Sequence, residues 1–323
     1  MSRRPVVAVL GDLNADVTIR VGAVPPPGGE AHADAALAVG GSAALTARWL
    51  AALGCEVRLA AAVGDDPFAD WLLQSLIRDG VPPTWLQRIA GRPTGLCFAL
   101  VHPGGERTLL ASPGAARDLQ WEEIPGSWLA GVDWLHVSGY AWRGGAERAA
   151  AERAVARARA EGIPLSLDPG AMAGTVRRDR DPLSAFALLL PNRHEIRDLT
   201  GHDDPWSGAA ELRRRGVGWV AVKLDRDGCL VQGPCGGACV PGHPVEVGNT
   251  TGAGDAFNAG AIVGVLSGWE PEEVGELGNL LGAAAVRHGA GGPLPERGDL
   301  LALLGRGSTL AGWIETHWRK EGR

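Results

Sequence analysis

The chain has 323 residues, a net charge of −6 and a sequence pI near 5.8. This charge argues against a nucleic-acid or anionic-membrane partner. No apolar run reaches the roughly 20 residues of a membrane span, and the N-terminus lacks the apolar core of a signal peptide, so we expect a cytoplasmic protein. The length suits one large domain, or one domain with a lid.

Residue usage excludes one way of binding phosphate. Lys223 and Lys320 are the only lysines and neither follows a glycine, so the chain has no Walker P-loop. Three of the five cysteines lie close together, at Cys229, Cys235 and Cys239. A metal site is one interpretation, but no second Cys or His pair completes a tetrahedron, so we expect reduced thiols.

The first predicted element is a buried strand that ends in polar residues. The apolar run from Pro5 to Gly11 is typical of a central strand. Asp12, Asn14 and Asp16 follow it directly. Short polar side chains at the end of a buried strand are suited to hold a polar ligand, and they also suit a turn or a helix cap.

A glycine pair opens the next helix. Gly40 and Gly41 precede a strong helical pattern from Ala43 to Leu53. Small residues there leave space for a ligand beside the helix N-terminus. Gly40-x-Ser42-x-Ala44 is also a degenerate nucleophile elbow, so a serine hydrolase is an alternative, although the full Gly-x-Ser-x-Gly pattern is absent.

Two segments do not fit an alternation of strands and helices. Residues 16–38 and a predicted hairpin at 95–112 contain short strands separated by Gly/Pro-rich turns. We therefore combine them into a small β-sheet lid. The predicted organisation is a large α/β domain, residues 1–12, 39–92 and 114–323, and a small β lid, residues 13–38 and 93–113.

From residue 121 onward, strands and helices alternate regularly. This pattern predicts an α/β fold with three Rossmann-like layers, in which helices cover both faces of a mainly parallel sheet. Ligands bind beyond the carboxyl ends of the strands in such sheets. Asn192 to Glu195 and Lys223 to Gly228 follow predicted strands, so we expect them to converge with the polar residues after the first strand.

A glycine-rich turn begins a buried helix of small residues in the C-terminal part of the chain. Residues 245–247 are predicted to end a strand, and a helix of small residues starts near Ala256. Gly252 and Gly254 allow close approach of a ligand, and the first N–H groups of a helix form an anion site. Asp255 is placed to accept a proton from a hydroxyl that attacks a phosphoryl group, or simply to stabilise the helix dipole.

These segments together resemble the ribokinase-like (PfkB) carbohydrate kinases, over about residues 5 to 300. Gly40-Gly41 and its helix resemble the N-terminal family motif, and Gly252-Ala253-Gly254-Asp255 resembles the C-terminal one. Asn192-x-x-Glu195 is similar to the motif that organises magnesium and phosphate. The resemblance implies an ATP- and Mg²⁺-dependent kinase that phosphorylates a hydroxyl, expected to be a hydroxymethyl group, of a small sugar-like acceptor.

The resemblance also implies a role for each matching residue. Asp255 is the expected base, kept ionised by the helix N-terminus. The N–H groups of Gly252, Ala253 and Gly254 are the expected anion hole. Glu195 is expected to hold Mg²⁺ through water. The expected substrate contacts are Asp12, Asn14, Asp16, Gly40, Gly41 and Arg107; the expected nucleotide contacts are Asn192, Lys223, Gly228, Thr251 and Asn279.

The chain departs from the family pattern at two positions. The family usually has Asp where this chain has Asn249, so the resemblance does not decide whether K⁺ is needed. The family also usually has an Asn that holds the sugar near Leu45, so ribose and simple hexoses cannot be assumed as acceptors. Arg107, in the lid, is a candidate contact for an acidic or phosphorylated acceptor.

Two other functions remain open at this stage. A nucleoside kinase of the same family would need a base pocket, to which Trp142 or Phe98 could contribute. A non-catalytic small-molecule sensor would keep the fold without the turnover. A homodimer through the lid is one interpretation, because an open sheet edge needs protection. We also expect Trp313 and Trp318 to dock on the large domain.

Overall fold

A computed structural model describes residues 3–102, 107–178, 183–289, 291–304 and 308–319. Within these residues the main element is a nine-stranded sheet, as the sequence predicts for an α/β fold. Neighbouring strands are parallel from β11 to β5, and β12 and β13 add an antiparallel edge. In spatial order the strands are β13 (Gly236–Val240), β12 (Cys229–Gly233), β11 (Trp219–Lys223), β10 (Leu188–Leu189), β9 (Leu165–Asp168), β8 (Trp134–Ser138), β1 (Val6–Leu10), β4 (Glu56–Val63) and β5 (Leu86–Arg88).

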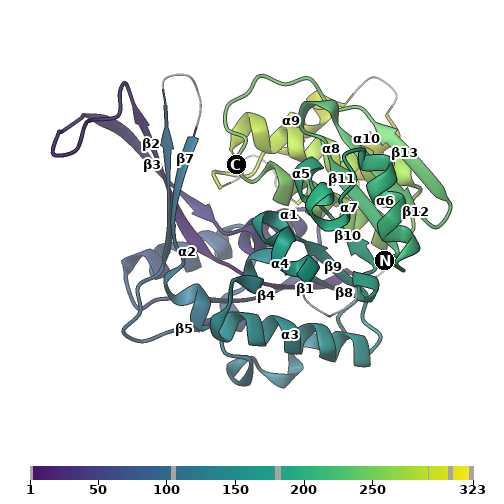
Figure 1. The fold of residues 1–323 in the computed structure, drawn as a ribbon, viewed down its shortest axis with the longest axis horizontal. Coiled ribbons are helices and arrows are strands. Elements are labelled where there is room, and N and C mark those ends of the chain that lie inside the picture. Colours follow the sequence, from purple (N-terminus) through teal and green to yellow (C-terminus); the bar gives the residue numbers. More distant parts are fainter. Residues whose placement is uncertain (1–2, 103–106, 179–182, 290, 305–307, 320–323) are drawn as a thin grey trace.

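Helices cover both faces of this sheet (Figure 1). Alternate residues of a strand point to opposite faces, and β1 is buried on both. Val7 and Val9 belong to a core shared with α1, α7 and α8, whereas Ala8 and Leu10 belong to a core shared with α3, α5 and α6. The helices are α1 (Ser42–Ala52), α2 (Pro67–Arg78), α3 (Gly145–Ala160), α4 (Ala173–Arg178), α5 (Arg193–Thr200), α6 (Pro205–Arg214), α7 (Ala253–Leu266), α8 (Pro271–His288), α9 (Arg297–Leu303) and α10 (Leu310–His317).

A separate four-stranded sheet stands out from this body (Figure 1). Its order is β3-β2-β6-β7, with β2 and β6 parallel and the outer pairs antiparallel. Much of it is uncovered, since residues 33–37 of β3 are all exposed. The strands are β2 (Asn14–Val21), β3 (Ala33–Gly40), β6 (Gly95–Val101) and β7 (Arg107–Ser112).

The structure corrects one predicted element and confirms another. Residues 245–247 form no strand, and Val247 is 68% exposed. The chain here is fixed instead to the end of α8, because the N–H groups of Gly248 and Asn249 donate to Val286 O at 3.1 and 2.9 Å. Docking of the tail is confirmed: Trp318 is buried, with its ring 5.8 Å from that of Trp49. In the described ranges, no helix is both long and apolar enough to cross a membrane.

Candidate active site

The strand order reverses between β1 and β8, and polar side chains meet at this point. The chain runs from β1 outward to β4 and β5, and later from β8 outward in the other direction. Asp12, after β1, accepts hydrogen bonds from Ser138 Oγ at 3.2 Å and from the N–H of Ala43 at 3.4 Å. A crevice at such a switch point is where ligands bind in open α/β sheets.

The glycine pair before α1 makes room for the carboxylate of Asp16 and for the backbone of Asp12. A Cβ at Gly40 would collide with the carboxylate of Asp16, and a Cβ at Gly41 would collide with the carbonyl oxygen of Asp12. Gly41 also has φ of 93°, a left-handed conformation that favours glycine. The Gly-Gly motif is therefore required by the close approach of β2 and the loop after β1.

Asn14 and Asp16 lie on the same face at the start of β2. Asn14 Nδ2 donates to Asp12 Oδ2 at 3.4 Å, while its buried Oδ1 has no partner among the described residues. Burial, and then the nearby Asp12 carboxylate, raise the pKa of Asp16 to about 7. The predicted acceptor residues are thus brought together, and they include an acceptor oxygen that lacks a donor.

The glycine-rich turn places Asp255 at the start of α7, as predicted. Gly252 caps the helix in a left-handed conformation, with φ of 78°. The hydroxyl of Ser42 donates to Asp255 Oδ1 at 2.7 Å, so this serine is held by a carboxylate and not arranged as an esterase nucleophile. Within the predicted anion hole, the N–H of Ala253 makes a long contact of 3.4 Å to Thr250 O.

The ionisation expected for Asp255 needs correction. Burial, followed by the Asp168 carboxylate, raises its pKa well above the ordinary value. Hydrogen bonding from Ser42 and the charge of Lys223 act in the opposite direction but do not compensate. Desolvation in the closed crevice therefore outweighs the helix N-terminus in the unliganded protein.

A buried ion pair lies beneath this helix start. Lys223 Nζ donates to Asp168 Oδ2 at 2.7 Å and to Asn258 Oδ1 at 3.3 Å. Asn258 Nδ2 donates to the same carboxylate oxygen at 2.6 Å. The ammonium lies close under the glycine turn, since a Cβ at Gly254 would be 3.5 Å from Lys223 Nζ. A positive charge therefore supports the anion site from below.

Asp168 and Asn258 were not among the residues predicted from the sequence. Asp168 ends β9, so its position after a buried strand was a usable signal, equal to that of Asp12. Asn258 is fully buried on α7, three residues after Asp255, and a polar residue in a helix of small apolar residues was the only signal. Both hold Lys223 rather than reaching outward.

Asn192 and Glu195 form a capping box at the start of α5. The Glu195 carboxylate accepts from the Asn192 N–H at 2.8 Å and from Asn192 Nδ2 at 2.7 Å. The backbones of Asn192 and Lys223 also form an isolated parallel bridge, which joins the start of α5 to the end of β11. Burial, and then the Asp168 carboxylate, raise the pKa of Glu195 to about 7. The charges of Asp168 and Lys223 thus act on both Glu195 and Asp255.

Other predicted contacts lie outside this cluster. Asn279 Nδ2 donates to Val240 O at 3.0 Å and to Pro241 O at 3.1 Å, and Gly228 packs so tightly on Val240 that a Cβ would collide with it. Both residues fix the β12–β13 hairpin. The N–H of Thr251 donates to Asn249 Oδ1 at 2.9 Å. Arg107 begins β7, but its side chain lies outside the described part of the structure.

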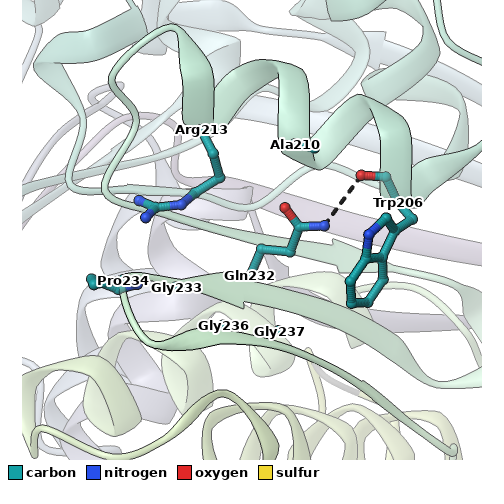
Figure 2. Close-up of a pocket in the computed structure, with 8 residues that line it drawn as sticks. All are labelled: Trp206, Ala210, Arg213, Gln232, Gly233, Pro234, Gly236 and Gly237. Atoms are coloured by element: carbon teal, nitrogen blue, oxygen red, sulfur yellow. Dashed lines mark hydrogen bonds between the residues drawn. The ribbon is translucent and has the colours of Figure 1, made fainter.

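A depression of about 340 Å³ lies elsewhere, between α6 and the β12–β13 hairpin (Figure 2). Figure 2 shows Trp206, Arg213 and Gln232 along it, with Gln232 Nε2 donating to Trp206 O at 3.2 Å. Arg213 donates to the carbonyl oxygens of Val217 and Gly218. None of the predicted site residues lines this depression, and its polar groups serve the packing of α6.

Comparison with known proteins identifies the family of this chain. The sequence profile of the pfkB family carbohydrate kinases matches residues 5–297. An uncharacterized sugar kinase from Archaeoglobus fulgidus is 32% identical over 254 residues, which span 77% of this chain and 99% of the relative. An ATP-dependent ribose-1-phosphate kinase from Halopiger xanaduensis is 33% identical over 286 residues, spanning 87% and 92%. The crystal structure of a ribokinase from Thermotoga maritima superposes with a TM-score of 0.80 at 26% identity, covering 93% and 99%.

Proposed function

Because this chain belongs to the PfkB family of carbohydrate kinases, we propose that it transfers the γ-phosphoryl group of ATP to a hydroxymethyl group of a small sugar. One observation carries the proposal: Asp255, held by Ser42, lies at a glycine-led helix start directly above the buried Lys223 ammonium. A base, an anion site and a cation are thus combined, which are the parts that phosphoryl transfer needs. ATP as donor is supported by the named activity of the Halopiger relative.

Asp255 acts as the base in this proposal. Ser42 occupies Oδ1, which leaves Oδ2 free for the acceptor hydroxyl. As the acceptor oxygen attacks the γ-phosphorus, its proton passes to Oδ2, and the bond to the bridging oxygen of ADP breaks. The N–H groups of Gly252, Ala253 and Gly254 stabilise the charge on the transferring group. Lys223, below the turn, adds to this stabilisation.

The acidic residues near α5 fit a magnesium ion held through water. Burial, and then the Asp168 carboxylate, raise the pKa of Glu195 to about 7, and a divalent cation would stabilise the ionised form. Both Glu195 oxygens already accept hydrogen bonds from Asn192, which favours contact through water over direct ligation. When bound, Mg²⁺ neutralises charge on the nucleotide phosphates. A need for K⁺ is a separate question, because this chain has Asn249 where the family usually has Asp.

The acceptor lies against the start of β2 in this proposal. Asp12, Asn14 and Asp16 present carboxylate and amide groups in one place, and the unpartnered Asn14 Oδ1 suits a donating sugar hydroxyl. A nucleoside acceptor has less support. Trp142 is buried in the core beneath the sheet, and Phe98 pairs with Val17, so it points to the face opposite Asp16.

We also propose that the small sheet, residues 13–38 and 93–113, is a lid over this acceptor site. Its strand β2 begins with the acceptor residues themselves, so movement of the sheet would change access to them. Arg107 on β7 remains a candidate contact for an acidic acceptor. Arg107→Ala is expected to raise KM for such an acceptor, and an unchanged KM would exclude the contact.

The test is acceptor-dependent release of ADP with ATP and Mg²⁺, over pentoses, hexoses, keto-deoxy acids, sugar phosphates and nucleosides. Release with one acceptor that is lost in Asp255→Asn supports the proposal. Release only with nucleosides supports the nucleoside alternative. If no acceptor causes release while one of them still raises the melting temperature, the protein is a sensor on this fold. Release at the wild-type rate in Asp255→Asn would show that another group is the base.

A further inference from the structure

Two arginines border the acceptor side of the site. Arg143 ends the short helical turn Gly139–Arg143 that follows β8 at the switch point. Its guanidinium carbon lies 4.3 Å from the centre of the Tyr140 ring. Arg117 lies in the turn Gly114–Asp118, which packs against the start of α3, since a Cβ at Gly145 would be 3.0 Å from Arg117 O. Neither arginine was predicted as a site residue.

The turn Gly139–Arg143 is connected to the acceptor residue Asp12 through Ser138. Burial raises the pKa of Tyr140 to about 12, and the carboxylates of Asp12, Asp168 and Asp255 add to this increase, whereas Arg143 opposes it. The N–H of Tyr140 donates to Ser138 Oγ at 3.3 Å, and Ser138 Oγ donates to Asp12 Oδ1 at 3.2 Å, so the turn that carries Arg143 lies beside the acceptor residue Asp12. Stacking on the Tyr140 ring fixes the plane of the guanidinium and leaves its N–H groups free at the edge.

The charge of Arg143 is also felt on the small sheet. Cys97 pairs with Asp16 in the β2–β6 register, so the two side chains share a face. Burial, and then Asp16, raise the pKa of Cys97 to about 11, while Arg143 acts to lower it. The charge of Arg143 therefore reaches the sheet face that carries Asp16.

The two arginine charges are not balanced by the protein around them. Among the described residues, Arg143 and Arg117 take part in no hydrogen bond or ion pair, and Arg143 is half-buried. Both arginine charges act on Glu147, which is 1% exposed and whose Oε1 has no partner among the described residues. Burial, and then Asp12, raise the pKa of Glu147 to about 9, so it is neutral near pH 7.

We propose that Arg143, with the exposed Arg117 as a second positive charge, binds an anionic substituent of the acceptor, a phosphate or a carboxylate on the sugar. The inference rests on the proposed kinase function, because it places the anion on the same molecule whose hydroxyl faces Asp255. A guanidinium binds phosphate or carboxylate oxygens through two parallel N–H groups. An anion there completes the hydrogen bonds of Arg143 and explains why no carboxylate of the protein does so.

The test compares an anionic acceptor with its neutral counterpart. We would measure kcat and KM for a pentose 1-phosphate, an aldonic acid and the free pentose, using wild type, Arg143→Met and Arg143→Lys. Arg143→Met is expected to lower the preference in kcat/KM for the anionic acceptor about tenfold or more, through KM, as loss of one charged hydrogen bond implies. Arg143→Lys should restore part of the preference. If Arg143→Met loses more of its preference for the pentose 1-phosphate than for the aldonic acid, the bound group is a phosphate. The reverse result indicates a carboxylate.

A matched control is Arg148→Met, five positions further along the chain but paired with Glu152 at 2.8 Å in α3. It should leave the preference unchanged. An equal loss in Arg148→Met, or no loss in Arg143→Met, would overturn the anion site.

Binding without ATP separates this inference from the kinase proposal. We would record the rise in melting temperature caused by each acceptor in wild type and Arg143→Met. A rise with the anionic acceptor that disappears in Arg143→Met supports the anion site even if no ADP is released, in which case only the kinase proposal fails. ADP release with neutral sugars, without any rise from anionic acceptors, would leave the kinase standing and refute the anion site.

Discussion

The start of α7 and the small sheet differ in how their residues are held. At α7 the side chains of Asp255, Lys223 and Asp168 are held in hydrogen bonds, and they are half-buried (Asp255 and Lys223) or buried (Asp168). In the small sheet, by contrast, Leu109 and Leu110 are 60% and 62% exposed, although neighbouring residues of a strand point to opposite faces. That part of the sheet is therefore uncovered on both sides.

This difference between the start of α7 and the small sheet corresponds to two tasks, phosphoryl transfer and acceptor recognition. Phosphoryl transfer needs groups that do not move, because catalysis by fixed charges depends on positions set before the reaction. Acceptor recognition and access can be assigned to an element with few buried contacts, because such elements move at low cost in free energy. We therefore expect substitutions at α7 to reduce the rate strongly, and substitutions in the small sheet to affect mainly KM or assembly.

The largest expected effect is on kcat when the base is removed. Asp255→Asn keeps the shape and the contact with Ser42 but accepts no proton, so kcat should fall about 10³-fold. The measurement is steady-state ADP release with the acceptor found above. Glu161→Gln, an exposed acid-to-amide change paired with Arg157 at 2.7 Å, is the control and should have no effect. A fall of less than tenfold in Asp255→Asn would remove it from the role of base.

The second effect is on stability. Asp168→Asn leaves the buried Lys223 ammonium without its anion, so the free energy of unfolding should fall by about 3–5 kcal/mol. Chemical denaturation measures this loss. Adding Lys223→Met should recover stability without recovering activity, because the cation under the anion site is then absent. Recovery of both would mean that the pair serves folding alone.

The pH dependence of activity tests the corrected ionisation of Asp255. Because its pKa is raised, the base is protonated below that pKa, and kcat/KM should fall about tenfold for each unit of pH below it. We would record kcat/KM from pH 5 to 9. A profile that stays flat to pH 5 would indicate that the helix N-terminus keeps Asp255 ionised after all.

Stability should respond to pH in the opposite direction through Asp16. Its pKa is raised from 3.8 to about 7 in the folded protein. The folded state therefore binds the proton more tightly, and this stabilisation is lost as pH rises from about 4 through about 7. The melting temperature of wild type should fall across this window more than that of Asp16→Asn. Parallel curves for the two proteins would contradict the raised pKa.

The smallest effect is expected in the small sheet. Leu109→Ser and Leu110→Ser remove exposed side chains, so each should change the free energy of unfolding by no more than about 0.5 kcal/mol. If the sheet pairs with a second copy of the chain, the double variant should be monomeric where wild type is dimeric. Light scattering after size-exclusion chromatography gives the mass. A monomeric wild type would exclude the dimer.

Local sequence determined the elements and the positions of the motifs. The apolar run before Asp12 predicted β1, and the helical pattern from Ala43 to Leu53 predicted α1 to within one residue at each end. The glycines at 40 and 41 were found because a close approach of backbone leaves no space for a Cβ, and this requirement is visible in the residue type itself. Each of these properties depends on a few consecutive residues.

Tertiary structure decided the partners and the charge states. Ser42 donates to Asp255, 213 positions along the chain, and Lys223 pairs with Asp168, 55 positions away. The sequence placed all four residues near turns or strand ends but contained no information on which would meet. Desolvation depends on everything packed around a group, so the raised pKa of Asp255 and the unbalanced charge of Arg143 became evident only in the folded chain.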